Sequence, residues 1–255
     1  MLDLFVSGRL PLSRFEWVLV TSWTYLFLAI MAQRQFVVRA KDAKSLPSGK
    51  SWTLFVHNLL LSLASLVMFL GLVRTSCRRS NIEGMDWLVC EPLNSNSSDS
   101  IIFWSYLYYL SKYYELGDTI LAFVCRGKGP RHFYMHVYHH FYVLYMSYFY
   151  VASRQSLATV GMLFNTFVHI FMYYYYARAA LQLETSWKNW VTRLQIIQFL
   201  FSFLLASIAV FIRPSWSLFS NECAGAYPLA ANCLFNFTLL LLFFNVLKSS
   251  KKMKK

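Results

Sequence analysis

Three histidines share one face of a predicted helix in the segment His136-Val-Tyr-His139-His140. Positions i, i+3 and i+4 stand above one another on an α-helix, and His132, one turn earlier, extends the stripe. Imidazoles can act as general bases, nucleophiles or metal ligands near neutral pH. Because the flanking residues are apolar and aromatic, we expect the stripe to face a protein interior or a cavity. It is therefore a candidate chemical centre.

A second set of ionisable side chains lies in the apolar segment 101–125, where Lys112, Glu115 and Asp118 follow one another at steps of three residues. On a helix these steps place them near one face. Placing an ionisable side chain within an apolar segment costs free energy, so such a side chain by default indicates a function. A structural alternative is a buried pair of Lys112 and Glu115 that fixes the helix register. Asp118 has no obvious basic partner on its own helix, so we predict a direct or supporting role for all three.

The segment 157–177 places Asn165, His169, Tyr173 and Tyr176 on one predicted helical face. Taken alone, a single histidine is more often a satisfied core residue, and such tyrosines more often form an aromatic belt at a membrane interface. The neighbouring histidine stripe reverses that preference. We therefore predict a catalytic role for His169 and substrate contacts for the other three.

Two further pairs of polar residues give weaker signals. Gln195 and Gln198 share a face of the segment 190–212, where substrate contact and hydrogen bonding between helices are equally good interpretations. His57 and Asn58, in the segment 52–73, are weaker still. Packing is the better interpretation for Asn58.

The composition indicates a membrane protein. Of the 255 residues, 57% are hydrophobic and only 14% are charged, whereas soluble domains carry about a quarter charged residues. The mean hydropathy is +0.42, and the apolar runs approach the length of about 20 residues that spans a bilayer. The net charge of +13 comes from short segments between those runs. Because no basic face or reading motif accompanies this charge, we expect no binding to nucleic acid.

We therefore expect an all-α fold with one domain over residues 1–255, a single bundle of seven transmembrane helices. The predicted spans cover residues 15–33, 52–73, 101–125, 132–152, 157–177, 190–212 and 227–247, and a basic tail follows at 248–255. Sixteen Lys and Arg residues lie on one side of such a bundle and seven on the other. The positive-inside rule then predicts a lumenal N-terminus and a cytosolic C-terminus.

The segments predicted to be lumenal carry a glycosylation sequon at Asn96 and three of the five cysteines, Cys77, Cys90 and Cys223. An oxidising lumen permits a disulfide. We favour Cys90 with Cys223, while Cys77 with Cys90 and free thiols remain alternatives.

The polar groups of three predicted spans lie at a similar depth below the cytosolic ends of those spans. Asp118, His139 and His169 each lie eight or nine residues from the predicted cytosolic ends of their spans, or roughly 12–14 Å at helical rise. The site should therefore open to the cytosol beneath a collar of basic residues, which suits a polyanionic substrate head. The collar residues are Lys128, Arg131, Arg178, Lys188 and Arg193.

Four motifs occur in a fixed order over about ninety residues. They are Lys112-x-x-Glu115-x-x-Asp118-Thr119, His136-x-x-His139-His140, His169-x-x-Met172-Tyr173-x-Tyr175-Tyr176 and Thr192-x-x-Gln195-x-x-Gln198-Phe199. In this order and spacing they resemble the ELO family of very-long-chain fatty acid elongases. One departure is Gly117, where that family commonly has a larger residue.

The resemblance implies a membrane enzyme of the endoplasmic reticulum that condenses long-chain acyl-CoA with malonyl-CoA. The products would be 3-oxoacyl-CoA, carbon dioxide and CoA, with no cofactor or metal. The implied helix bundle encloses an acyl tunnel within membrane lipid. The reaction cycle implies reductases and a dehydratase as partners, and a homo-oligomer stays open.

The mechanism that we expect has two stages. His139 attacks the acyl thioester to give an acyl-imidazole, and malonyl-CoA then loses carbon dioxide to form the enolate that attacks it. His169 or Asn165 would stabilise the oxyanion, while His136 and His140 would position or deprotonate neighbours. Asp118 would orient an imidazole. A one-step reaction with histidine acting only as a base is the alternative.

Two other classes of protein share parts of this pattern. Di-iron membrane desaturases or hydroxylases also use HxxHH boxes, but they need more histidines than the six of this chain. A seven-helix receptor or transporter would have the same topology. Against it stands the convergence of lysine, carboxylates and histidines at one depth, which exceeds what ligand binding requires.

Overall fold

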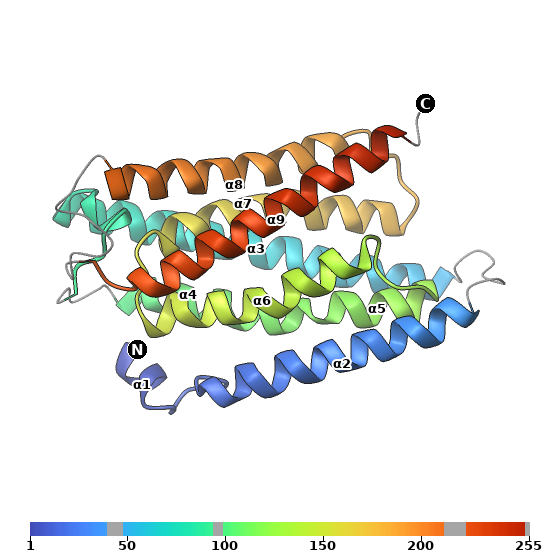
Figure 1. The fold of residues 1–255 in the computed structure, drawn as a ribbon, viewed down its shortest axis with the longest axis horizontal. Helices are drawn as coiled ribbons and strands as arrows, with labels where there is room; N and C mark the ends of the chain where they lie inside the picture. The colour runs from blue at the N-terminus through green and yellow to red at the C-terminus, as the bar shows by residue number, and fades with distance from the viewer. Residues whose placement is uncertain (40–47, 94–98, 212–222, 253–255) are drawn as a thin grey trace.

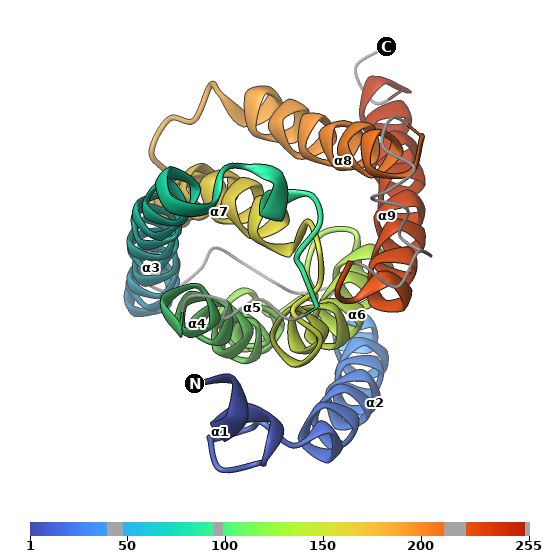
Figure 2. The ribbon, with the colours of Figure 1, turned by 90° about the vertical axis from the view of Figure 1, so that its left-hand side faces the viewer.

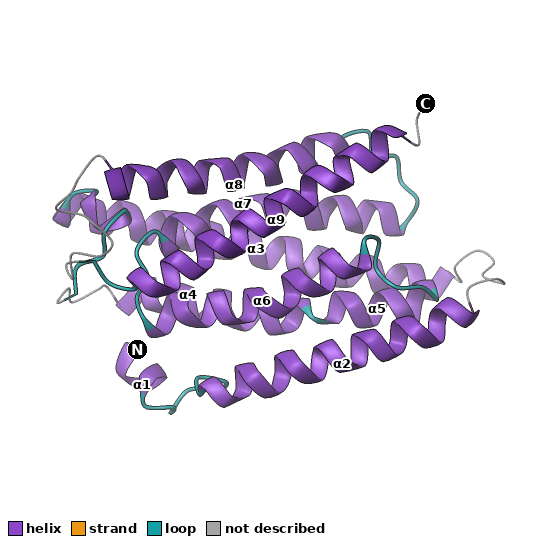
Figure 3. Cartoon of the chain, viewed as in Figure 1, coloured by secondary structure: helices purple, strands orange, loops and turns teal. Residues whose placement is uncertain are grey.

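A computed structural model describes residues 1–39, 48–93, 99–211 and 223–252 of the chain. Within these ranges the chain forms helices joined by loops, without a β-strand (Figure 3). The helices are α1 (Leu2–Val6), α2 (Phe15–Arg39), α3 (Ser48–Glu83), η2 (Asp86–Leu88), α4 (Asp99–Glu115), α5 (Gly117–Arg126), α6 (Phe133–Ala152), α7 (Ala158–Ala180), α8 (Lys188–Phe211) and α9 (Ala226–Lys252).

The long helices run roughly along one axis and form an elongated bundle (Figure 1). Helix α3 packs along α7, and α4 packs along α6. Viewed from one end of the bundle, α2 lies outside α6, and α8 and α9 pair on the other side (Figure 2). Helix α4, which carries Lys112 and Glu115, therefore contacts α5, α6 and α7, the other helices that carry most of the predicted site.

Four of the described helices are long and apolar enough to cross a membrane. These segments are Phe15–Phe36, Ser51–Glu83, Lys188–Ile208 and Ala226–Asn245, and each overlaps a predicted span. The other three predicted spans coincide with α4 and α5, with α6, and with α7, the helices that carry the polar motifs. The count of seven spans and their orientation stay predictions.

The predicted span 101–125 is wrong as one continuous helix. Helix α4 ends at Glu115 and α5 begins at Gly117. Around the break, the amides of Leu116 and Thr119 donate to carbonyls three residues earlier, at 3.2 Å each. Glycine costs about 1 kcal/mol in a helix interior and favours such local changes.

Helix α3 also differs from its predicted span, because it continues from residue 73 to Glu83. Arg79, expected in a loop, therefore lies on the helix and is 3% exposed. Its guanidinium donates to both carboxylate oxygens of Glu91, at 2.8 and 3.0 Å, and stacks 4.2 Å over the ring of Trp87. Two charge-assisted hydrogen bonds compensate the buried cation.

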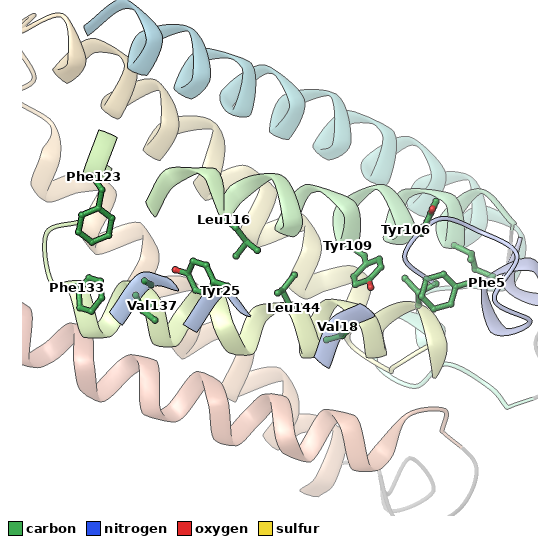
Figure 4. Close-up of a cluster of buried hydrophobic side chains, with 13 residues drawn as sticks. Phe5, Val18, Tyr25, Tyr106, Tyr109, Leu116, Phe123, Phe133, Val137 and Leu144 are labelled. Carbon is green, nitrogen blue, oxygen red and sulfur yellow. The ribbon is translucent and has the colours of Figure 1, made fainter. Parts of the chain in front are cut away.

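A buried apolar cluster joins α1 and α2 to α4, α5 and α6 (Figure 4). Phe5, Val18, Tyr109 and Leu144 are at most 1% exposed at its centre. The hydroxyl of Tyr109 donates to the carbonyl of Leu12 at 2.7 Å, so the buried ring also satisfies its polar atom. Close packing of this kind is the main attraction between helices in lipid.

A disulfide between Cys90 and Cys223 joins the segment after α3 to the segment before α9, with Cα atoms 5.0 Å apart. A short β-bridge pairs Pro92 with Cys223, and the amide of Ala224 donates to the carbonyl of Glu91 at 2.7 Å. We call this end of the bundle the disulfide end. The sequon at Asn96 and residues 253–255 of the predicted tail lie outside the described residues.

Replacing Cys90 and Cys223 together with serine should lower the free energy of unfolding by about 2–4 kcal/mol, because a bridge across this long loop restricts the unfolded chain. Thermal unfolding in detergent measures the change. Cys77→Ser is the matched control, since Cys77 is an exposed free thiol. Equal stability of the double variant and the control would contradict a structural role for the bridge.

Candidate active site

The centre of the site is a fully buried ion pair in the last turn of α4. Lys112 Nζ lies 2.7 Å from Glu115 Oε1, and the two side chains are 1% and 2% exposed. The ammonium also lies 4.2 Å from the centre of the Tyr108 ring. A cation and a carboxylate at this depth compensate each other, and either alone would be costly.

Helix α7 extends this pair through Asn165. Asn165 Oδ1 accepts hydrogen bonds from Lys112 Nζ at 3.1 Å and from the Tyr108 hydroxyl at 2.9 Å. Because a lysine ammonium only donates, these contacts fix which end of the amide faces α4. The amide nitrogen then faces His169 Nε2 at 3.3 Å.

This amide orientation determines the tautomer of His169. Since Asn165 donates to Nε2, that nitrogen carries a lone pair, and the proton lies on Nδ1. His169 Nδ1 is 3.6 Å from Glu115 Oε1. The arrangement resembles a base held by a carboxylate, with Nε2 as the basic atom.

Asp118, just after the helix break, contacts a histidine that the sequence analysis ranked low. His57 Nε2 of α3 lies 2.7 Å from Asp118 Oδ1, and the hydroxyl of Tyr173 donates to Asp118 Oδ2 at 2.9 Å. Asp118 was expected to orient an imidazole, and the imidazole that it contacts in the structure is that of His57. A histidine in an apolar span, together with an aspartate lacking a partner on its own helix, was the signal that could have identified this pair.

The histidine box lies on α6 and is held by a hydroxyl. His136 Nε2 is 2.9 Å from Thr119 Oγ1, which also contacts the Tyr25 hydroxyl of α2 at 2.9 Å. Tyr25 could not be predicted from the sequence, because nothing local distinguishes it from the other aromatic residues of its span. Thr119 is the last residue of the first motif.

The other two imidazoles of the box continue toward α9. The His140 ring lies 4.3 Å from that of His136 and 5.1 Å from that of His139. The His139 ring is stacked on Phe235 of α9, with centroids 6.3 Å apart. Two buried atoms, His140 Nδ1 and Glu115 Oε2, have no hydrogen-bond partner in the described part of the chain. Such atoms are candidates for contact with water or a ligand.

The remaining predicted contact residues lie around this network. The side-chain amide of Gln195 on α8 donates to Met172 Sδ on α7 at 3.4 Å, and Gln198 is half-buried on the same helix. The Tyr176 ring lies 6.2 Å from that of Tyr173 but keeps 39% exposure. The structure therefore brings Tyr173 into hydrogen bonding with Asp118 and joins Gln195 to α7.

The predicted collar residues lie at one end of the bundle, opposite the disulfide end; four are exposed, and Arg178 in the last turn of α7 is half-buried. Lys128 and Arg131 lie between α5 and α6, while Lys188 and Arg193 lie at the start of α8 (Figure 1). His132 lies in the turn before α6.

Among the residues that the structure describes, no group of three or more His, Cys, Asp or Glu side chains is placed to hold a metal ion. His136 contacts a hydroxyl, and His169 contacts an amide and a carboxylate. Imidazoles beside a buried ion pair and an amide donor are suited to nucleophilic attack, proton transfer and stabilisation of an oxyanion.

Comparison with known proteins gives one consistent result. A sequence model described as the GNS1/SUR4 family, ELO, matches residues 10–255. Fatty acid elongase A of Dictyostelium discoideum is 33% identical over 221 residues, which cover 87% of this chain and 77% of that protein. Very long chain fatty acid elongase 5 of Tachysurus fulvidraco is 30% identical over 200 residues, which cover 74% and 63%. The chain therefore belongs to the ELO family.

Proposed function

We propose that this protein catalyses the condensation of a long-chain acyl-CoA with malonyl-CoA, the step that lengthens a fatty acid by two carbons. The observation that carries the proposal is the buried network around Lys112, Glu115, Asn165 and His169 beside the histidine box. Lys112 and Glu115 belong to one motif on α4, while His169 begins another motif on α7, where Asn165 also lies. The names of the relatives, fatty acid elongases, support the same reaction class.

In the first stage, a lone pair of the His139 imidazole attacks the acyl carbonyl carbon, and the carbon–sulfur bond breaks. The product is an acyl-imidazole, and the imidazole proton leaves with the CoA thiolate as a thiol. In the second stage, malonyl-CoA loses its carboxylate as carbon dioxide. The resulting enolate carbon attacks the acyl group, and the departing imidazole takes up a proton from water. One 3-oxoacyl-CoA, one CoA and one carbon dioxide result.

The geometry favours Asn165 over His169 as the oxyanion donor. His169 Nε2 accepts from the Asn165 amide, so it carries no proton that it could donate to an oxyanion. The second N–H of that amide is available for a developing negative charge. Glu115 would hold the proton of His169 Nδ1 and keep Nε2 basic.

The proposal also includes the membrane arrangement. Seven spans would place the N-terminus in the lumen of the endoplasmic reticulum and the C-terminus in the cytosol. The basic collar, which comprises Lys128, Arg131, Arg178, Lys188 and Arg193, would bind CoA phosphates at the cytosolic surface. The acyl chain would run between the helices toward the disulfide end, and reductases and a dehydratase would complete the cycle.

Purified protein in lipid vesicles tests the reaction. Incubation with malonyl-CoA labelled at carbon 2 and a panel of acyl-CoAs should give labelled 3-oxoacyl-CoA two carbons longer than its substrate. Carbon dioxide and free CoA should be released in equal amounts. Samples without acyl-CoA are the control. A hydroxylated or desaturated product that requires oxygen, or no product with any acyl-CoA, would contradict the proposal.

A further inference from the structure

His57 stands where helix α3 faces the break between α4 and α5. Its side chain is 9% exposed, and Nε2 lies 2.7 Å from Asp118 Oδ1. Its ring stacks on Tyr114, with centroids 5.2 Å apart. Both the imidazolium and the neutral tautomer with a proton on Nε2 can donate to the carboxylate. The contact thus supplies the partner that Asp118 lacks on its own helix.

The carboxylate of Asp118 also contacts α7. Its second oxygen accepts the hydroxyl of Tyr173, which is 1% exposed. The Tyr173 ring in turn packs edge-on against the His169 imidazole, with centroids 5.2 Å apart. A side chain on α3 is thereby linked to the basic histidine of the network through two hydrogen bonds and one ring contact.

Gly117 supplies the space that the imidazole occupies. A Cβ atom at position 117 would lie 3.4 Å from His57 Cε1, at ordinary van der Waals contact. Alanine would therefore just fit, and a longer side chain would meet the imidazole. Because Gly117 has no side chain, the His57 imidazole can occupy the space beside the start of α5.

General packing of α3 on α7 does not need His57. The two helices lie along each other, and Ser62 donates to the carbonyl of Ile170 at 2.8 Å. The neighbour Asn58 donates within its own helix, to the carbonyl of Leu54 at 2.6 Å. Among these three polar side chains of α3, His57 is the one that contacts Asp118.

From these contacts we propose that His57 is a positioning residue of the condensation site. It holds the Asp118 carboxylate so that Tyr173 is fixed against His169, and Gly117 provides the space that this requires. This inference rests on the proposed function. The role is indirect, because His57 acts through Asp118 rather than on a substrate.

The first test compares two variants of His57 with a matched control. His57→Phe keeps a ring but removes the donor, and it should lower kcat about tenfold while both KM values change less than about twofold. His57→Gln carries an N–H near the position of Nε2 and should restore most of kcat. Ser62→Ala removes a contact between the same two helices and should leave kcat unchanged. Wild-type kcat in His57→Phe, an equal loss in His57→Gln, or an equal loss in Ser62→Ala would overturn the proposal.

The second test measures stability and does not depend on activity. Gly117→Leu should lower the thermal unfolding temperature in detergent when His57 is present and change it little in a His57→Ala background. If Gly117→Leu lowered the unfolding temperature equally in both backgrounds, the claim that the two side chains occupy the same space would be refuted. If the wild-type protein gave no 3-oxoacyl-CoA, the proposed function and the catalytic part of this inference would fail together. The effect of Gly117→Leu on the unfolding temperature, measured with and without His57, would still show whether side chains at positions 57 and 117 compete for the same space.

Discussion

Replacing His139 with alanine is expected to abolish condensation, with a fall in kcat/KM of at least about 1000-fold. The proposed mechanism passes through a covalent bond to this imidazole, and alanine offers no nucleophile. The fold should survive, because His139 is half-buried and its ring stacks on Phe235. Within the described part of the chain, no hydrogen bond joins the His139 side chain to another helix.

Incubation with acyl-CoA alone separates a nucleophile from a base. The wild-type protein should release about one CoA per molecule in a burst, and hydroxylamine should trap the acyl group as a hydroxamate. His139→Ala should give neither signal. Tyr134→Ala, which changes a side chain on the same helix that is 84% exposed, is the control and should keep the burst. A burst in His139→Ala, or its absence in the wild-type protein, would favour the one-step alternative.

Replacing Lys112 with methionine is expected to lower the free energy of unfolding by about 3–5 kcal/mol. The substitution preserves the volume of the side chain but leaves Glu115 as an uncompensated charge at 2% exposure. It also removes the donor that orients Asn165. Chemical or thermal unfolding in detergent measures the loss, and condensation should fall together with it.

A double variant shows whether the unpaired charge is the cause. Lys112→Met combined with Glu115→Leu removes both charges and should recover most of the lost stability, without activity. Arg14→Met breaks a largely exposed ion pair with Glu16 and should cost less than about 1 kcal/mol. If the double variant were as unstable as Lys112→Met alone, burial of an unpaired carboxylate would not explain the effect.

The sequence predicts the helices well because apolar runs and their polar breaks are local properties. It placed α6 and α7 within three residues of the structure at each end. It failed at the break before Gly117, because the steps of three from Lys112 to Asp118 fit a continuous helix equally well. Only packing against α3 and α7 distinguishes the two conformations.

The candidate site was predictable as a set of residues but not as a set of contacts. Helical spacing put Lys112 and Glu115 within reach of each other, and the structure has them paired. The partners of Asp118 and His136 come from other helices, since His57 lies on α3 and Thr119 on α5. Pairing between helices depends on their rotation about their own axes, which sequence spacing does not specify.

The disulfide also orders events during synthesis of the chain. Cys90 precedes Cys223 by 133 residues, so the bridge can close only after nearly all the helices have been made. Until Cys223 has been made, Cys90 cannot form this bridge and can carry a free thiol. A thiol-reactive label on Cys90 would therefore distinguish newly made, incomplete bundles from finished ones.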